Sequence, residues 1–264
     1  MRKSDGPEGA GEGKGEQPVG SGDRRAIVQS VSRALDVLEL LRESGRPLSA
    51  ADIAKAAELE RTIVYRLLRT LAQREMISES DGAYSLGPSA VLLGQRFLGN
   101  LPLRRVALPY MVDLQTKVLK DHPWTLALSM SINDLSAVIE RMWTPATPLG
   151  LVLDLGDTQP LYRTAAGRAI LAHRTEAEIH AMLDPDHQDL LPELEKIRAA
   201  GGVALVDGSE TFGLQAIACV IRRDETAVAA IGIGGVDLGE ELAYNSRLAM
   251  QIRHAAEAIG RMIP

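Results

Sequence analysis

Residues 49–86 read SAADIAKAAELERTIVYRLLRTLAQREMISESDGAYSL, and several structural signals follow one another in this stretch. Ser49 is followed three residues later by Asp52, a capping-box pattern that predicts the start of a short helix over residues 50–57. Over residues 61–74 apolar side chains recur at i, i+3, i+4 and i+7, which predicts another helix after a short turn. Two helices joined in this way are typical of a helix-turn-helix.

The segments on either side extend this prediction. An Asp-Gly dipeptide at 81–82 lies between strand-like residues 76–80 and 83–86, and it favours the type I′ turn of a two-stranded hairpin. Upstream, apolar residues at helical spacing predict a first helix over residues 27–45. Three helices followed by a hairpin make a winged helix-turn-helix.

The remainder of the chain has a different pattern. A helix from Pro88 to about Asn100 is interpreted as a linker, and an amphipathic helix is expected over 103–118. Because most of the strand-like segments that follow are joined by short loops, we expect an antiparallel sheet with helices outside, and not a Rossmann fold. The expected strands are 124–131, 137–143, 149–153, 203–206, 214–221 and 227–233, and the expected helices are 164–172, 190–200 and 240–262.

The expected fold class is therefore α+β, with four parts along the chain. Residues 1–26 contain seven glycines and almost no apolar side chain, so they are expected to be a disordered tail. The winged helix-turn-helix is expected over 27–87, the linker helix over 88–100, and an α/β domain with an antiparallel sheet over 101–264.

Composition excludes several classes of protein. The chain has 264 residues, 45% of them hydrophobic, and a net charge of −6, so it can form real cores but has no overall excess of positive charge. Its single cysteine, Cys219, excludes an internal disulfide framework and lies in an apolar segment, where we expect a buried thiol. The sequence has neither a signal-peptide pattern nor an apolar run of bilayer-spanning length. The predicted location is the cytoplasm, without membrane contact.

Positive charge is concentrated near the amino terminus. Between residues 24 and 75 the sequence has ten basic and seven acidic residues, and the helix expected over 61–74 has four arginines and no acidic residue. Such a helix fits the major groove of duplex DNA. The DNA contacts predicted on it are base-edge contacts from Arg61, Thr62 and Tyr65 and phosphate contacts from Arg66 and Arg69.

Further DNA contacts are expected beside this helix. Arg33 in the first helix, Ser49 at the start of the second, and the wing are predicted to touch the flanking backbone, with Arg24 and Arg25 as additional candidates. A charged helical face is, however, more often simply solvated, and some winged helices dock proteins. The alternative is a metabolite-sensing or enzymatic protein whose winged helix docks a protein and not DNA.

Six motifs are distributed along the chain: SVSRALDVL at 30–38, RTIVYRLLRTL at 61–71, YSLG at 84–87, TAAGRA at 164–169, GLQAIA at 213–218 and AAIGIGG at 229–235. Together they resemble the IclR family of bacterial transcription regulators. The resemblance implies a GAF-like effector-binding domain behind the linker helix, and a ligand-responsive regulator of catabolic genes rather than an enzyme. The implied partners are double-stranded operator DNA, a small organic or aromatic acid, further copies of the chain in a homodimer or homotetramer, and RNA polymerase.

The same resemblance implies an effector pocket. Family members that bind small keto acids often have a cysteine and two serines where this chain has Ala216, Gly232 and Gly234. Loss of these polar groups favours a bulkier, more apolar effector, such as an aromatic acid bound largely by backbone amides. Alternatively, the small residues only allow a helix and the sheet to pack closely. The implied lining is Leu151, Ala165, Ala166, Leu214, Ala216, Gly232 and Gly234, with Val206 or Asp207 at a further wall position.

Signatures of enzymes and metal sites are weak by comparison. The patterns HExxH, GxSxG and GxxxxGK[ST] do not occur in the sequence. His180, Asp184, Asp186, His187 and Asp189 cluster in a proline-containing polar loop, where such side chains are more often solvated than bound to a metal. We therefore expect no catalytic residue, no metal and no cofactor.

Overall fold

The computed structural model describes residues 27–183, 185–208 and 214–264. The tail expected over residues 1–26 lies outside the described residues. No helix in the described part of the chain is both long and apolar enough to cross a membrane.

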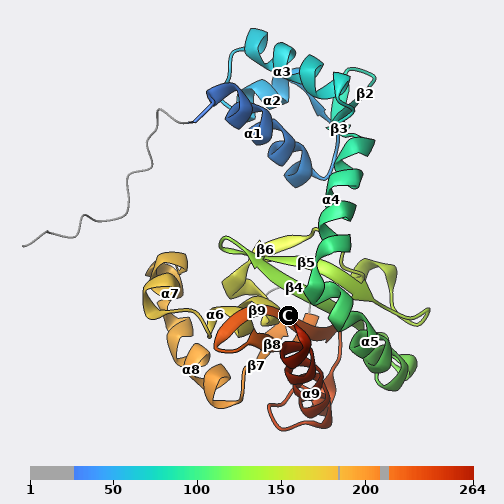
Figure 1. The fold of residues 1–264 in the computed structure, drawn as a ribbon, viewed down its shortest axis with the longest axis vertical. Helices are drawn as coiled ribbons and strands as arrows, with labels where there is room; N and C mark the ends of the chain where they lie inside the picture. The colour runs from blue at the N-terminus through green and yellow to red at the C-terminus, as the bar shows by residue number, and fades with distance from the viewer. Residues whose placement is uncertain (1–26, 184, 209–213) are drawn as a thin grey trace, which may run out of the picture. The chain divides into compact units, whose positions relative to one another are not determined.

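The described residues divide into two compact units, with the boundary between Leu93 and Gly94. The boundary falls within helix α4, Pro88–Asn100, which is the helix interpreted as a linker (Figure 1). None of the α4 side chains is buried.

The first unit contains three helices and an antiparallel sheet with the strand order β1-β3-β2. Its core is centred on Val37, Ile53 and Leu68, each at most 1% exposed. The hairpin turn has φ angles of 53° at Asp81 and 75° at Gly82, the positive values that a type I′ turn requires. The predicted winged helix-turn-helix is confirmed. Its elements are α1 Gln29–Ser44, β1 Leu48–Ser49, α2 Ala50–Ala56, α3 Arg61–Gln73, β2 Ile77–Ser80 and β3 Ala83–Leu86.

The second unit is built on a six-stranded antiparallel sheet with the order β6-β5-β4-β9-β8-β7 (Figure 1). Helices α5 and α9 pack on one face, and α6, α7 and α8 pack on the other. The predicted antiparallel sheet with helices outside is confirmed. The bounds are α5 Pro102–Lys117, β4 Thr125–Ile132, β5 Leu135–Met142, β6 Thr158–Pro160, α6 Ala165–Leu171, α7 Glu176–Met182, α8 Leu191–Ala199, β7 Val203–Gly208, β8 Leu214–Arg223, β9 Thr226–Gly235 and α9 Arg247–Met262.

The strand expected over 149–153 is wrong. Residues Leu149–Leu151 form a 3₁₀ turn, and Leu149 is 83% exposed. The place beside β5 in the sheet is taken instead by the three-residue strand β6, Thr158–Pro160. Pro148 and Gly150 disfavour a strand at this segment, because proline lacks a donor for the ladder and glycine has no side chain to pack.

Two helices differ from the pattern expected after residue 164. The last helix begins at Arg247 and not near 240, because the Ser246 hydroxyl accepts a hydrogen bond from the Ala249 amide at 3.0 Å and caps it there. Helix α7 was not expected at all. It begins at a capping box formed by Thr175 and Glu178.

Candidate nucleic-acid interface and effector cavity

Helix α3 has one buried face and one exposed face. Val64 and Leu68 are at most 1% exposed and pack in the core of the first unit. Five of the seven predicted DNA contacts lie at exposed positions, at spacings that bring them onto one side of the helix. They are Arg61, Thr62, Tyr65, Arg66 and Arg69.

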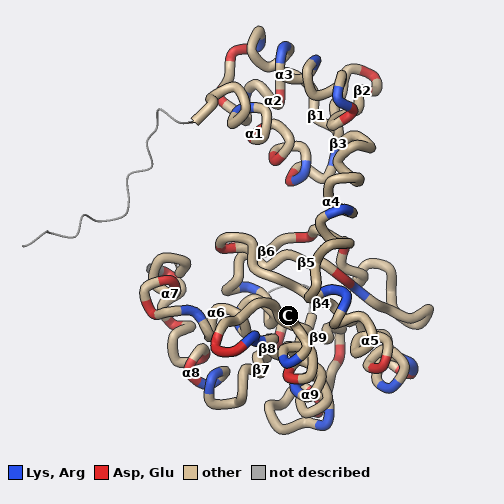
Figure 2. The backbone as a smooth tube through the Cα atoms, in the orientation of Figure 1, with Lys and Arg blue, Asp and Glu red and all other residues tan. Residues whose placement is uncertain are grey.

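The positive charge of this face is not neutralised by other side chains. Helix α3 contains three arginines and no acidic residue (Figure 2). Within the described ranges, none of these three guanidinium groups forms an ion pair or a side-chain hydrogen bond. Their donors are therefore available to phosphate oxygens and to guanine edges.

The other two predicted contacts lie on different elements. Arg33 is a half-buried residue of α1, and Ser49 is the N-cap of α2. The Ser49 hydroxyl donates to the Asp52 carboxylate at 2.7 Å and accepts from the Asp52 amide at 3.1 Å. This hydroxyl is thus already engaged in the cap, and a contact from it to DNA remains a prediction.

The wing carries negative charge near its tip. Glu79 on β2 and Asp81 in the turn are both exposed. A phosphate brought to this tip would meet charges of its own sign, which is unfavourable. The structure therefore supports α3 more strongly than the wing as the DNA-contacting element.

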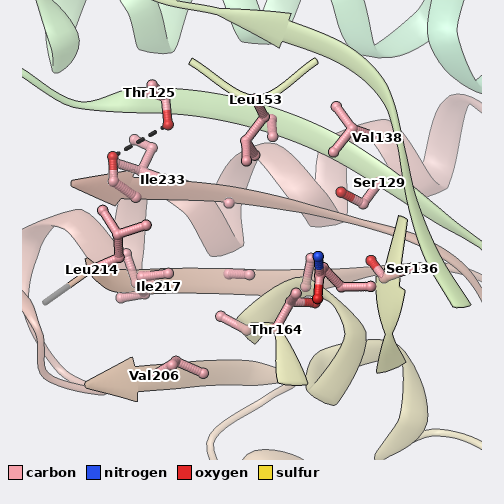
Figure 3. Close-up of a pocket in the computed structure, with 18 of the residues that line it drawn as sticks. Thr125, Ser129, Ser136, Val138, Leu153, Thr164, Val206, Leu214, Ile217 and Ile233 are labelled. Atoms are coloured by element: carbon pink, nitrogen blue, oxygen red, sulfur yellow. Dashed lines mark hydrogen bonds between the residues drawn. The ribbon is translucent and has the colours of Figure 1, made fainter. Parts of the chain in front are cut away.

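The second candidate site is a cavity of about 470 Å³ on the face of the sheet that packs against α6 (Figure 3). All six strands contribute to its lining, and the remaining lining residues lie between 151 and 166, including the start of α6. Eight of the nine implied effector positions line it: Leu151, Ala165, Ala166, Val206, Leu214, Ala216, Gly232 and Gly234.

Asp207 is the position that the structure leaves out of this lining. Successive residues of a strand point to opposite faces, so Val206 faces the cavity and Asp207 does not. The exposed Asp207 carboxylate accepts a hydrogen bond from Gln215 Nε2 at 3.1 Å. Of the two residues implied at this wall, the structure places Val206 in the cavity.

Sequence reasoning missed the part of the cavity that lies on β4, β5 and the segment before α6. The residues on β4 and β5 occur at every second position, which is the period of a strand face. That alternation was a usable signal, but only once the two strands had been aligned with each other. The missed residues are Thr125, Ala127, Ser129, Ser136, Val138, Leu153, Asp157, Thr158, Gln159, Arg163 and Thr164.

Gly232 and Gly234 differ in the space around them. A Cβ atom at Gly232 would lie 2.7 Å from Ala218 Cβ and 2.9 Å from the Ile217 carbonyl oxygen, closer than Cβ atoms normally approach other atoms. At Gly234 the nearest atom would be 3.5 Å away, which is ordinary contact. Gly232 therefore serves close packing, whereas Gly234 leaves space in the cavity.

Among the residues that the structure describes, the candidates for catalysis and metal binding are not brought together. Cys219 is 1% exposed, and burial raises the pKa of its thiol to about 12, so the thiol is protonated and inert at neutral pH. No three described His, Cys, Asp or Glu residues are placed to hold one metal ion, and Asp184 lies outside the described residues. The His187 ring packs against Tyr162 with 4.1 Å between the ring centroids.

Two family models match the chain, and their matches correspond to its two units. The model described as "IclR helix-turn-helix domain" matches residues 30–81, and "Bacterial transcriptional regulator IclR C-terminal" matches residues 95–261. The chain belongs to the IclR family. It is a transcription regulator with an amino-terminal DNA-binding helix-turn-helix and a carboxyl-terminal effector-binding domain.

Known IclR-family proteins are similar to the chain over most of its length. The glycerol operon regulatory protein of Streptomyces coelicolor is 29% identical over 252 residues, which is 89% of this chain and 96% of that protein. A solved IclR regulator from Alicyclobacillus acidocaldarius is 23% identical, with a TM-score of 0.74 over 89% of this chain and 98% of its own. An IclR homologue from Microbacterium hydrocarbonoxydans, solved in complex with 4-hydroxybenzoate, is 22% identical, with a TM-score of 0.71 over 88% and 98%.

Proposed function

We propose that this regulator binds operator DNA by placing α3 in the major groove. The observation that carries the proposal is the exposed face of α3, where three arginines without an ion-pair partner among the described residues lie beside Thr62 and Tyr65. Arg61, Thr62 and Tyr65 would contact base edges, while Arg66 and Arg69 would contact phosphates. A two-fold dimer would present two such helices to a pseudopalindromic operator.

Salt-dependent binding of single-site variants tests this division of roles. Arg66→Ala and Arg69→Ala are expected to weaken binding to all duplexes by similar factors, and each should reduce the slope of log affinity against log salt by about 0.9. Arg61→Ala is expected to relax the choice between operator and non-operator DNA by about 1–3 kcal/mol, because it removes a base-edge contact. Fluorescence anisotropy at several salt concentrations measures both quantities.

Arg105→Ala is the matched control, because Arg105 is an exposed arginine of the second unit. It removes the same charge and is expected to leave the choice of operator unchanged. If neither class of α3 variant alters DNA binding, the groove assignment is wrong and a protein-docking winged helix is favoured.

We further propose that the cavity binds an aromatic or similarly bulky, apolar acid. The cavity lining is largely aliphatic, and Ala216 and Gly234 leave space where smaller-ligand relatives have polar side chains. The solved homologue with 4-hydroxybenzoate bound gives independent support for this class of ligand. Calorimetric titration with a panel of keto acids and aromatic acids tests the proposal. Tighter binding of glyoxylate or pyruvate than of any aromatic acid would overturn it.

The location, target genes and assembly of the protein complete the proposal. We propose that the protein acts in the cytoplasm on catabolic genes, as a homodimer or homotetramer that affects RNA polymerase at the promoter. It has no catalytic role in this proposal. The named function of the Streptomyces coelicolor relative, regulation of the glycerol operon, supports a catabolic role.

A further inference from the structure

Two serine hydroxyls open onto the cavity and have no hydrogen-bond partner among the residues that the structure describes. Ser129 on β4 is 4% exposed, and Ser136 on β5 is 5% exposed. Within the described part of the chain, neither hydroxyl forms a hydrogen bond (Figure 3). The Thr125 hydroxyl on the same wall, by contrast, donates to the Gly234 carbonyl oxygen at 3.3 Å. Because both hydroxyls open onto the cavity, their donors and acceptors are available to a ligand or to water there.

The register of the sheet brings the two serines to one part of the wall. Ser129 pairs with Val138 on β5, and Ser136 is two residues from Val138 on the same face. Diagonal neighbours of this kind lie about 7 Å apart, and their hydroxyl oxygens can approach more closely than that. One ligand atom between them would therefore be within reach of both hydroxyls.

The serine pair lies on a different side of the cavity from the implied effector positions. Ser129 pairs with Ala230 on β9, and Gly232 is two residues further along that strand. Gly232 is thus a diagonal neighbour of Ser129, and Ser136 lies on the next strand, further from Gly232. The distance from Gly232 to the far end of the serine pair is comparable to the length of one aromatic ring with its substituents. A single ring with substituents at opposite positions would reach both sides.

The chemistry of the two serine hydroxyls favours a neutral ligand group over a carboxylate. Both hydroxyls can donate and accept, but they carry no charge, and a buried carboxylate needs a cation or several N–H donors. Arg163 is the cationic side chain among the described lining residues, and it is exposed. The Arg174 guanidinium, which bonds Ser131 directly opposite Ser136, is already paired with Glu178. We propose that Ser129 and Ser136 form a specificity subsite that hydrogen-bonds a hydroxyl or carbonyl substituent on the effector ring, opposite its carboxylate. This inference rests on the proposed aromatic-acid effector.

Calorimetric titration of the full chain with benzoate and with 4-hydroxybenzoate tests the subsite. The natural chain is expected to bind 4-hydroxybenzoate about tenfold more tightly than benzoate, because only the former fills the hydrogen bonds of both serines. In the double variant Ser129→Ala, Ser136→Ala this ratio should fall to about one, with benzoate affinity changed by less than about twofold.

Ser131→Ala is the matched control. Ser131 lies on the same face of β4 but outside the cavity lining, and its hydroxyl accepts from Arg174 Nη2 at 2.6 Å. The control is expected to keep the preference for 4-hydroxybenzoate. If the double variant of Ser129 and Ser136 also preferred 4-hydroxybenzoate over benzoate, the subsite proposal would be wrong. The proposal of an aromatic-acid effector would not be affected.

Two further outcomes are decisive. If the natural chain binds neither acid, and neither acid shifts its melting temperature, the effector proposal fails and the subsite fails with it. Thermal unfolding without ligand separates a binding role from a structural one. Removal of two hydroxyls that have no partner among the described residues should leave the melting temperature equal or higher, whereas a fall of several degrees would show that the hydroxyls stabilise the fold.

Discussion

The two cavity glycines are expected to respond differently to the same substitution. Gly234→Ser should keep the free energy of unfolding within about 0.5 kcal/mol of the natural chain, because a Cβ atom fits there. It should also weaken aromatic-acid binding and strengthen pyruvate binding, since it fills space and adds a hydroxyl. Gly232→Ser should cost about 1–3 kcal/mol, because its Cβ would crowd Ala218 and the Ile217 carbonyl. Urea unfolding and calorimetry measure the two effects.

Gly234→Ala separates volume from polarity in this experiment. It should be as stable as Gly234→Ser and should weaken aromatic-acid binding without strengthening pyruvate binding. Equal destabilisation by serine at both glycine positions would contradict the difference in space that distinguishes them.

Part of the effector cavity was predictable residue by residue from the sequence. The family resemblance implied nine effector positions, eight of which line the cavity, and strand alternation separates Val206 from Asp207. Ser129 and Ser136 could not be predicted as a pair. Their proximity depends on how β4 and β5 align and on a cavity that exists only after the helices pack.

Among the elements, α2 depends on the capping box at its start. Ser49→Ala is expected to lower the free energy of unfolding by about 1 kcal/mol at pH 7, because Asp52 loses its hydrogen-bonding partner and one helix N–H loses its acceptor. Hydrogen bonds from Ser49 hold the pKa of the Asp52 carboxyl below its usual value. The stabilisation from that carboxylate is therefore present above its ordinary pKa and is lost as the pH falls through the lowered value. Urea unfolding at pH 7 and pH 3 should show a smaller effect of Ser49→Ala at pH 3.

Ser49→Asp distinguishes the cap from a DNA contact. Aspartate caps helices as well as serine does, so stability should be largely kept, but a negative charge beside a phosphate should reduce DNA affinity. Unchanged DNA affinity in this variant would remove Ser49 from the interface.

The elements that the sequence predicted correctly have strong local signals. The Asp-Gly turn at 81–82 and the capped helix at Ser49 are examples, because a few residues determine each. The segment 149–153 misled because Leu151 and Leu153 line a cavity and do not pair in a sheet. Helix α7 was missed because only Ile179 of its side chains is buried, so it has no apolar period.

For the whole molecule, the acidic net charge and the DNA-binding role are compatible because electrostatic attraction acts over short distances. At physiological salt a charge is screened within about 8 Å, so the local charge of α3, and not the net charge of the chain, governs its attraction to DNA. The net charge of −6 predicts solubility and weak non-specific binding, and not the absence of a nucleic-acid partner.

Regulation requires that the effector and the operator influence each other through the same chain. If an acid weakens operator binding tenfold, the protein–operator complex must bind that acid tenfold more weakly than the free protein does, because the coupling free energy, about 1.4 kcal/mol, is the same in both directions. Titration of the tightest-binding acid of the panel into free protein and into the complex measures this factor. Arg66→Ala should lower DNA affinity and leave the factor unchanged, since it removes a phosphate contact only. Equal affinity of the acid for free protein and complex would show that the effector acts after DNA binding, for example on RNA polymerase, and not through operator affinity.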